Sequence, residues 1–302
     1  MSYTKEELIY LYNMDLEELL TKASKFHSEK IEFCSIVNAR NGKCSQNCKY
    51  CAQSSYYRTE IESYPLVDLD VIRRAAAESK LNQATRFAVV TSGKTPDEED
   101  FGKILEMIKE LNKIDGLKSC ASIGILNDEQ AKKLAEAGLK RFHHNINTSE
   151  SYYPEVCTTH SWQDRLNTCK LVKKYGMELC CGVILGMGET VEQRVEMAME
   201  LAEIHPESIP INILMPIPET PFESYYDKID EENILRTIAV FKIANPESVI
   251  RFCGGRMRLS DANQERALKT CVEGILIGNY LTTVGKNPKE DIQTVENLFS
   301  RR

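Results

Sequence analysis

The strand pattern Ile31-Glu32-Phe33-Cys34-Ser35-Ile36-Val37 leads into the loop Cys44-Ser45-Gln46-Asn47-Cys48-Lys49-Tyr50-Cys51, and the rest of the chain is organised around this stretch. The C-x3-C-x2-C spacing brings three thiolates onto one short loop. Thiolates are the usual ligands of iron–sulfur clusters, and a four-iron cluster held by three of them keeps one iron open for a ligand that is not protein. The alternative is zinc. Zinc sites commonly pair two C-x2-C or C-x2-H halves, and no second half lies nearby in the sequence.

Strand patterns alternate with helix patterns along the chain. Residues 4–29 predict two short helices, the first with the capping box Thr4-Lys5-Glu6-Glu7. Thr95-Pro96-Asp97-Glu98 predicts a helix with Thr95 as N-cap and Pro96 at its first position. The predicted strands are 31–37, 86–90, 118–123, 141–146, 178–184, 208–213, 249–253 and 275–277, and the helices that follow them are 68–80, 95–113, 127–137, 161–176, 190–204, 231–245, 262–273 and 288–299.

Eight strands, each followed by a helix, indicate parallel βαβ units that close into a (β/α)8 TIM-type barrel of the α/β class. No linker, low-complexity tract or break in composition divides the chain. We therefore predict one domain over 1–302, with an N-terminal helical extension at 1–30 and a C-terminal cover at 285–302.

The composition describes a globular protein and excludes some partners. The chain has 302 residues, 42% of them hydrophobic and 27% charged, and its net charge of −7 argues against nucleic acid or an anionic membrane surface. No apolar run reaches the roughly 18 residues of a membrane span. The N-terminus resembles neither a signal peptide nor a transit peptide. We expect a cytoplasmic protein.

Eleven cysteines are many for such a chain. Without a secretion signal, a disulfide framework is not expected. Reduced cysteines in this number indicate metal sites and a reducing, anaerobic cell. The alternative is that several are small buried hydrophobes, which we expect for Cys157, Cys169 and Cys271.

Four of the eight predicted strands carry cysteine. Active sites of such barrels lie at the carboxyl ends of the strands, and alternate side chains along a strand face the interior. Of the adjacent pair Cys180 and Cys181, only one can point inward, whereas Arg251 and Cys253 share a face. The residues leave two interpretations open. The strand cysteines Cys34, Cys120, Cys180 or Cys181, and Cys253 either hold a second metal site or only fill space.

The cysteine loop, with Tyr50 before its last cysteine, is similar to the signature of the radical S-adenosylmethionine (SAM) superfamily. Over residues 31 to 285 the chain also resembles the biotin synthase family. The motifs that carry this resemblance are Ser35-Ile36-Val37-Asn38-Ala39, Cys51-Ala52-Gln53-Ser54, His144-Asn145, Thr158-Thr159, Arg165-Leu166, Gly186-Met187-Gly188-Glu189, Pro210-Ile211-Asn212, Arg236-Thr237-Ile238-Ala239, Gly254-Gly255-Arg256 and Leu281-Thr282-Thr283.

The resemblance implies sulfur insertion into dethiobiotin, driven by a radical from SAM bound to the [4Fe–4S] cluster of Cys44, Cys48 and Cys51. The cofactors supply the hard chemistry, so no separate catalytic side chain is implied. An amide such as Asn212 offers a donor and an acceptor to the ureido ring, and Arg165 can pair with a carboxylate. The implied SAM-binding residues are Tyr50, Asn145, Asn147, Arg165, Gly188 and Glu189, and the implied substrate-binding residues are Asn145 and Asn212. Without the resemblance, these polar residues would be interpreted as hydrogen-bonded strand ends.

The chain departs from the family pattern at the second cluster. Familiar members hold a [2Fe–2S] cluster with three strand cysteines and one arginine, and Cys120, Cys180 and Arg251 match three of those positions. The fourth position is Ala88, which cannot bind iron, and the aspartate expected at 147 is Asn147. We predict a rebuilt auxiliary cluster of four irons that supplies the sulfur and lies beside Arg251. Its predicted ligands are Cys34, Cys120, Cys180 and Cys253.

The resemblance further implies a homodimer and a flavodoxin or ferredoxin as electron donor. One alternative is another radical SAM enzyme of related barrel type, similar to the hydrogenase-maturation or methylornithine-forming enzymes. The segment Pro210-Ile211-Asn212 and the strand cysteines argue against it. A second alternative is a non-catalytic iron–sulfur carrier, which would need neither the loop 186–189 nor Asn145.

Overall fold

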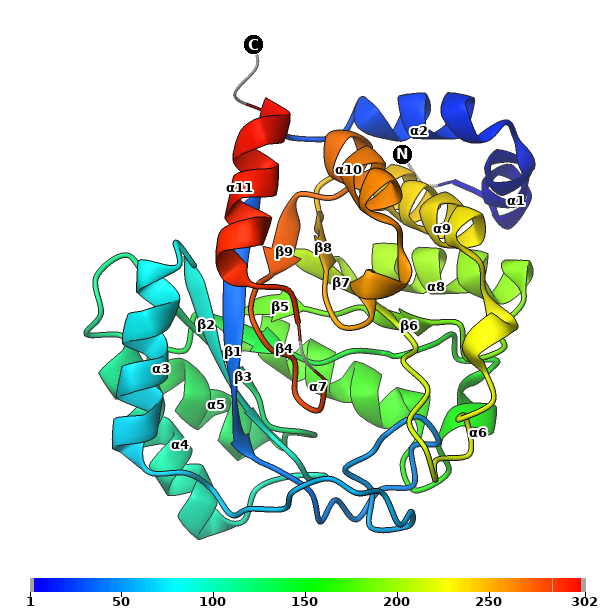
Figure 1. Ribbon diagram of the computed structural model, residues 1–302. Coiled ribbons are helices and arrows are strands. Elements are labelled where there is room, and N and C mark those ends of the chain that lie inside the picture. Colours follow the sequence, from blue (N-terminus) through cyan, green and yellow to red (C-terminus); the bar gives the residue numbers. More distant parts are fainter. Residues whose placement is uncertain (1–2, 284, 300–302) are drawn as a thin grey trace.

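The protein, represented by a computed structural model, is described over residues 3–283 and 285–299. Its core is a closed parallel sheet with the strand order β5-β4-β3-β2-β1-β9-β8-β7-β6, closed by the pairing of β5 with β7 (Figure 1). This is the predicted TIM-type barrel. The strands are β1 (Glu32–Arg40), β2 (Arg86–Thr91), β3 (Lys118–Ser122), β4 (Arg141–His143), β5 (Glu178–Cys180), β6 (Val183–Leu185), β7 (Ser208–Ile213), β8 (Val249–Phe252) and β9 (Gly274–Leu276).

The strand predicted as 178–184 is interrupted and appears as β5 and β6. The interruption lies at Gly182, whose N–H donates to Oδ1 of Asn145 at 2.9 Å instead of to a neighbouring strand. A Cβ at Gly182 would lie 2.0 Å from the carbonyl oxygen of Pro210, so only glycine permits this close approach. The side chain of Asn145 therefore takes the place of a neighbouring strand at this break.

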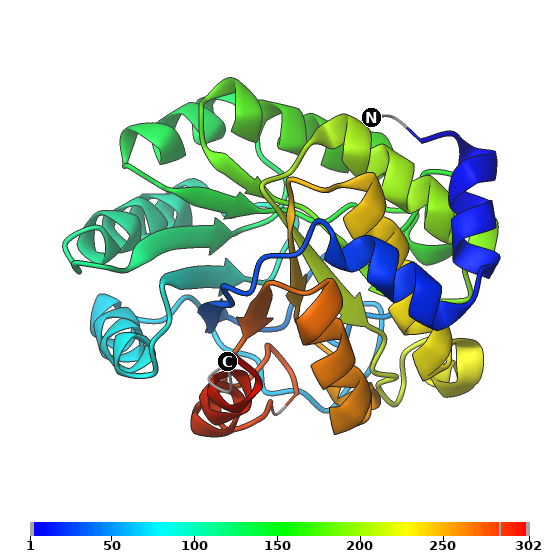
Figure 2. The same cartoon turned by 90° about the horizontal axis from the view of Figure 1, so that it is seen from above.

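Helices surround the barrel, as the view from above shows (Figure 2). The helices predicted to start at residues 127, 161 and 190 do start there, with Asn127, Ser161 and Thr190 as their N-caps. The prediction of Thr95 as an N-cap is wrong, because the helix starts later. Its N-cap is Asp97, whose side chain accepts from the N–H of Asp100 at 2.8 Å. The helices are α1 (Lys5–Asn13), α2 (Leu16–Ser24), α3 (Leu69–Leu81), α4 (Glu98–Leu111), α5 (Asp128–Glu136), α6 (Tyr153–Val156), α7 (Trp162–Lys174), α8 (Val191–Ile204), α9 (Glu231–Ala244), α10 (Asp261–Thr270) and α11 (Pro288–Phe299), with 3-10 turns at Tyr226–Lys228 and Arg256–Arg258. The sequence did not predict α6 or the two 3-10 turns.

The two N-terminal helices pack outside the barrel, α1 against α8 and α9, and α2 against α9 and α10. The capping box of Thr4 is confirmed by reciprocal bonds with Glu7, and Arg194 donates to the hydroxyl of Tyr12 at 2.9 Å. The predicted division into extension, barrel and cover stays a prediction. The predicted extension includes residues 1–2 and the predicted cover includes residues 300–302, and both of these ends lie outside the described residues. No helix in the described part of the chain is long and apolar enough to cross a membrane.

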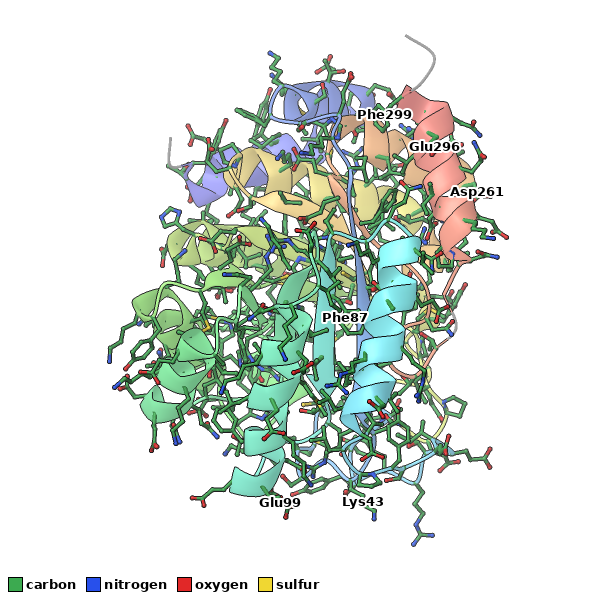
Figure 3. All side chains as sticks on the ribbon, turned by 90° about the vertical axis from the view of Figure 1, so that its left-hand side faces the viewer. Lys43, Phe87, Glu99, Asp261, Glu296 and Phe299 are labelled. Carbon is green, nitrogen blue, oxygen red and sulfur yellow. The ribbon has the colours of Figure 1, made fainter. Side chains whose placement is uncertain are left out.

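Alternation along β2 separates the core from the cavity. Phe87 is buried against α3 and α4 among Ile72, Met107 and Leu111, and Figure 3 shows it on the strand behind these two helices. Arg86 and Ala88, the residues on either side of Phe87, line the barrel interior. Figure 3 also places Lys43, in the cysteine loop, at the opposite end of the molecule from Phe299 in α11. The cysteine loop therefore lies at the carboxyl ends of the strands, where the active sites of such barrels are found.

Candidate functional site

The loop that follows β1 is folded on itself by its own hydrogen bonds. The N–H of Cys44 donates to the carbonyl of Gln53 at 2.9 Å, and the carbonyl of Cys44 accepts from Ser55 at 2.8 Å. The N–H of Cys51 donates to the carbonyl of Cys48 at 3.0 Å. These bonds close the loop, and all three of its cysteines are free thiols. A closed loop with three free thiols fits the ligand set of a cluster with one open iron.

A half-buried guanidinium lies beside these thiols. Arg165 donates to the carbonyl of Asn145 at 2.9 Å and to the hydroxyl of Tyr153 at 2.6 Å. Burial raises the pKa of Cys51 to about 11, and Arg165 acts in the opposite direction on both Cys51 and Cys48. Arg165 therefore favours the deprotonated form that a metal ligand must take, and its charge suits an anionic ligand such as a carboxylate.

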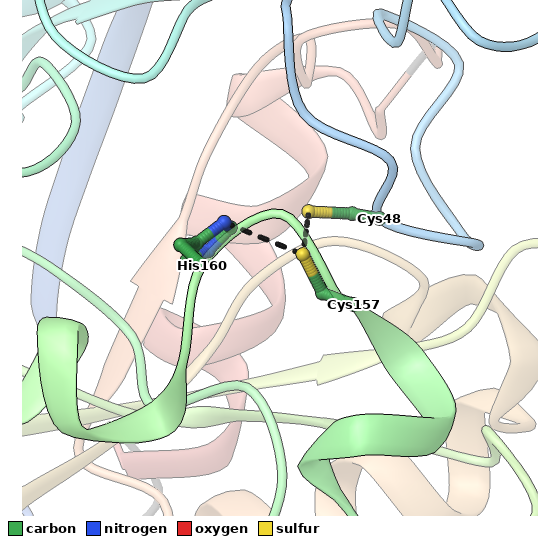
Figure 4. Close-up of side chains that lie close together, drawn as sticks. All are labelled: Cys48, Cys157 and His160. Carbon is green, nitrogen blue, oxygen red and sulfur yellow. Dashed lines mark hydrogen bonds between the residues drawn. The ribbon is translucent and has the colours of Figure 1, made fainter.

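Cys48 also contacts a segment that is distant in the sequence. Its Sγ lies 3.7 Å from Sγ of Cys157, whose Sγ in turn lies 3.3 Å from Nδ1 of His160 (Figure 4). Cys157 is buried as expected, yet it has polar partners. The hydrogen bonds from Cys48, His160 and Thr159 hold the pKa of Cys157 well below its usual value, at about 3, although burial opposes this shift. Sequence reasoning did not single out His160.

A cavity of about 390 Å³ runs from this loop into the barrel. Its volume is within the range of small-molecule sites. Tyr50 and Cys51 line it at the carboxyl ends of the strands, and strand cysteines line it deeper in the barrel. Of the adjacent pair, Cys180 lines the cavity, whereas Sγ of Cys181 faces Cys169 at 3.8 Å. All four candidate ligands of the second cluster are in the cavity wall: Cys34, Cys120, Cys180 and Cys253.

Five charged side chains form a paired group next to these thiols, which we call the charged floor: Glu32, Arg86, Arg141, Glu178 and Arg251. Arg86 pairs with Glu32 at 2.7 Å and with Glu178 at 2.9 Å, and Arg141 pairs with the same two carboxylates at 3.5 and 2.7 Å. Arg251 also pairs with Glu32. Three guanidinium groups thus share two carboxylates, which leaves an excess of positive charge. Burial raises the pKa of Glu32, but the arginines outweigh burial and hold it at about 2.

Sequence reasoning found Arg251 and missed the rest of this floor. The sequence does contain a pattern that could have predicted Arg86 and Arg141. Each lies two residues before another cavity-lining residue on its strand, as Arg251 lies two residues before Cys253. Nη1 of Arg251 lies 3.1 Å from Sγ of Cys34. Nη1 of Arg86 is buried without a hydrogen-bond partner among the described residues. Such an unpaired buried donor in a cavity wall fits an anionic ligand.

The strand thiols differ in acidity. Burial raises the pKa of Cys120 to about 12 and also raises the pKa of Cys34 and of Cys253. Burial acts on Cys180 in the same direction, but His143 and the nearby arginines outweigh it and lower the pKa of Cys180 to about 7. Nδ1 of His143 lies 3.4 Å from Sγ of Cys180. His143 is a further site residue that sequence reasoning did not select.

Three of the predicted SAM-binding residues meet at the cavity mouth. Nδ2 of Asn147 donates to the hydroxyl of Tyr50 at 2.9 Å, and both residues line the cavity with Asn145. Glu189 is placed differently. Its carboxylate accepts from the N–H groups of Gly186 and Met187, both at 2.8 Å, and pairs with Arg194 at 3.1 Å. Its side chain therefore holds its own loop, and neither Glu189 nor Gly188 is in the described cavity wall.

Asn212 lines the cavity with its amide partly engaged. Nδ2 donates to the carbonyl of Val183 at 3.1 Å, and Oδ1 accepts from the N–H of Gly254 at 3.1 Å. One amide hydrogen and one lone pair remain for a ligand. A urea offers the complementary acceptor and donor.

Comparison with known proteins gives the class first. Residues 40–202 match the radical SAM superfamily, and residues 210–298 match the biotin and thiamin synthesis associated domain. The structure resembles that of methylornithine synthase (PylB), with a TM-score of 0.83 and 17% identity over 99% of this chain and 93% of that chain. At this identity the likeness concerns the fold alone. The barrel, its cysteine loop and the superfamily match define a radical SAM enzyme.

Curated relatives identify the family. The chain is 46% identical over 269 residues to the biotin synthase of Acetivibrio thermocellus, covering 89% of this chain and 83% of that protein. It is 42% identical over 302 residues to the biotin synthase of Clostridium perfringens strain 13, covering 99% and 94%. This chain belongs to the biotin synthase family. The predicted resemblance is thereby confirmed, and the alternatives among related barrel enzymes are not favoured.

Proposed function

We propose that the chain forms biotin by inserting sulfur into dethiobiotin, and that a four-iron auxiliary cluster inside the barrel supplies the sulfur. The main support for this proposal is that Tyr50 and Cys51 of the radical SAM loop line the same cavity as the four strand cysteines. When bound, the first cluster and SAM supply the radical chemistry, and the second cluster supplies the sulfur. A substrate in the cavity would lie between the two thiol sets.

The donor set supports a multi-iron cluster over a single ion. Within residues 3–283 and 285–299, the strand cysteines form no group of three whose Sγ atoms all lie within 4.8 Å of one another. A single tetrahedral ion needs closer ligands. Ala88 takes the cavity position where a ligand is missing, and it pairs in register with Cys120 on β3 and with Ile36 on β1. Cys34 lies two residues before Ile36, on the same face of β1.

The chain's own residues would bind and orient the reactants. Asn147 holds the phenol of Tyr50 at the cavity mouth, where the phenol would pack near adenine. Arg165 would pair with the carboxylate of SAM, and Asn212 with the ureido ring of dethiobiotin. Arg86 and Arg251 would offset the negative charge of a thiolate-bound cluster, and hydrogen bonds to cluster sulfurs tune its potential.

Counting iron and acid-labile sulfide on the anaerobically reconstituted chain tests the cluster assignment. About eight irons per chain support two four-iron clusters, and about six would indicate a two-iron auxiliary cluster. About four irons would contradict a second cluster altogether.

The variant Cys34→Ala tests the ligand set. It should lose the auxiliary cluster and biotin formation but keep reductive cleavage of SAM. Cys181→Ala is the matched control, because Cys181 is buried one residue from Cys180 but faces the helix layer. Retention of the auxiliary cluster in Cys34→Ala would make Cys34 a packing residue only.

Dethiobiotin-dependent formation of 5′-deoxyadenosine tests the substrate. Stimulation by dethiobiotin is expected. If dethiobiotin does not increase 5′-deoxyadenosine, another substrate is processed, and if SAM is not cleaved under a strong reductant, the chain is a cluster carrier. The homodimer, the flavodoxin or ferredoxin donor, the anaerobic host and the cytoplasmic location remain part of this proposal.

A further inference from the structure

Three metal-binding side chains converge where the radical SAM loop meets the segment after α6. Sγ of Cys48, Sγ of Cys157 and a ring nitrogen of His160 all lie within 4.8 Å of one another, and all three residues are buried. No other group of three such residues in the described part of the chain is as compact. Figure 4 shows both thiols and the imidazole pointing toward one another.

The distances match a tetrahedral site. With Zn–S near 2.3 Å and Zn–N near 2.0 Å, tetrahedral geometry puts two sulfurs about 3.8 Å apart and a sulfur and a nitrogen about 3.5 Å apart. The observed separations are 3.7 Å between Cys48 and Cys157 and 3.3 Å between Cys157 and Nδ1 of His160. Oε1 of Gln46 accepts a hydrogen bond from the same Nδ1 at 2.8 Å, so when a metal replaces that proton this oxygen is near enough to take the fourth position.

The two segments are bound to each other independently of any metal. The side-chain oxygen of Asn47 accepts from the N–H groups of Thr158 at 3.0 Å and Thr159 at 3.2 Å. The N–H of Asn47 donates to the hydroxyl of Thr159 at 3.1 Å. The donors are therefore held together before a metal binds, which lowers the entropic cost of binding.

The imidazole is also oriented from its far side. Nε2 of His160 lies 2.8 Å from the hydroxyl of Tyr153, so Nδ1 is the nitrogen that faces the thiols. Histidines that bind metals usually hydrogen-bond through their second nitrogen in this way. The motif Cys157-x2-His160 is the second C-x2-H half that a zinc site requires, although 105 or more residues separate it from the loop.

We propose that the cluster-free chain binds one zinc-type divalent cation at Cys48, Cys157 and His160, and that this ion competes with assembly of the radical SAM cluster. The competition follows because Cys48 is shared, and one thiolate in the mononuclear site is not free to bind the cluster. Metal binding requires Cys48 and Cys157 as thiolates. Only the competition rests on the proposed function, and zinc binding itself does not depend on biotin formation.

Metal titration of the full, cluster-free chain tests the site. Co²⁺ serves as the probe, because a tetrahedral site with two thiolates gives thiolate-to-cobalt charge-transfer bands and intense d–d bands. One equivalent of this signal, displaced by Zn²⁺, should be lost in Cys157→Ala and in His160→Ala. It should persist in Cys271→Ala, a buried cysteine elsewhere, and in Cys34→Ala. The same bands at the same stoichiometry in Cys157→Ala would overturn the proposal.

Reconstitution tests the competition. The chain is preloaded with one equivalent of Zn²⁺ and then supplied with iron and sulfide under anaerobic conditions. The parent chain should lose most of its radical SAM cluster loading, measured as iron content, and Cys157→Ala should load as it does without zinc. Equal inhibition of both chains would contradict the competition. Failure of biotin formation in a fully loaded chain would bear on the proposed function alone.

Discussion

Asn147 shows at the scale of one residue how backbone and site are coupled. Its φ of 70° is in the left-handed region, which asparagine tolerates better than most residues. Its N–H donates to the carbonyl of Gly182 at 3.2 Å, and its carbonyl accepts from Ile184 at 2.8 Å. This conformation directs the side chain to the hydroxyl of Tyr50. The position therefore serves both the backbone and the cavity mouth.

The variant Asn147→Ala should bind SAM about tenfold more weakly, because it removes a hydrogen bond worth about 1 kcal/mol and strains the backbone. Asn147→Gly separates the two effects, since glycine adopts the positive φ but cannot hold Tyr50. Asn147→Asp should bind SAM as the parent does, with Tyr50 now donating. Calorimetric titration of SAM into the cluster-loaded chain measures these affinities. Parent-like binding by Asn147→Ala and Asn147→Gly would show that Tyr50 needs no support from Asn147.

At the scale of an element, α8 contains an unfavourable carboxylate. Glu200 is largely buried, and Oε1 accepts from the N–H of Glu150 at 2.8 Å, whereas Oε2 has no partner in the described structure. Burial, followed by the neighbouring carboxylates of Glu196, Glu150 and Glu203, raises the pKa of Glu200 to about 8, although the hydrogen bond from the N–H of Glu150 opposes the shift. The folded chain therefore holds this proton more tightly than the unfolded chain.

The pH dependence follows from the sign of that shift. As pH rises from 4.5 towards 8, the unfolded chain releases the proton of Glu200 first, so stability falls over this window and stays level above it. Glu200→Gln should unfold at the same temperature as the parent below pH 4.5. It should be more stable by on the order of 1 kcal/mol at pH 8, after allowance for solvent screening.

Thermal unfolding in buffers from pH 4.5 to 8.5 measures this gain. Glu192→Gln, on the exposed first turn of the same helix, is the control and should show no gain that grows with pH. A Glu200→Gln gain that is equal at all pH values would mean that proton binding at this carboxyl does not limit stability.

At the scale of the whole molecule, the auxiliary ligands would join strands that are far apart in the sequence. Cys34 lies on β1, Cys120 on β3 and Cys180 on β5, and Cys253 directly follows β8. A cluster held by these residues would cross-link the barrel through its cavity. Because a metal site that forms only in the folded state stabilises that state, cluster removal should weaken the whole barrel.

The cluster-free chain should unfold at least about 5 °C below the loaded chain, which corresponds to a few kcal/mol at this size. The chain has one tryptophan, Trp162, which is buried at the start of α7, and its fluorescence reports unfolding. Cys34→Ala, reconstituted in parallel, should show an intermediate value because it keeps the first cluster. Identical unfolding temperatures for the loaded and cluster-free chains would contradict the cross-link.

Local patterns in the sequence determined most of the architecture. Helix caps such as Asn127 and Ser161 and the alternation of strands with helices depend on neighbours within a few residues, so periodicity and capping chemistry predicted them. The period of two along each strand put Arg251 and Cys253 on one face, and the family resemblance then indicated that Cys34, Cys120 and Cys253 face the interior, where they line the cavity. The radical SAM loop could also be predicted from local sequence, because its three cysteines lie within eight residues.

Only the tertiary structure decided the contacts between distant segments. No local pattern predicts that Cys157 and His160 reach Cys48, that Gly182 must be glycine to pass Pro210, or that three arginines share Glu32 and Glu178. These contacts depend on the register and closure of the barrel, which bring together residues that are far apart in the chain. The sequence alone therefore determined the barrel and the thiols that line it, whereas barrel closure decided which charges and which second metal-binding half lie beside those thiols.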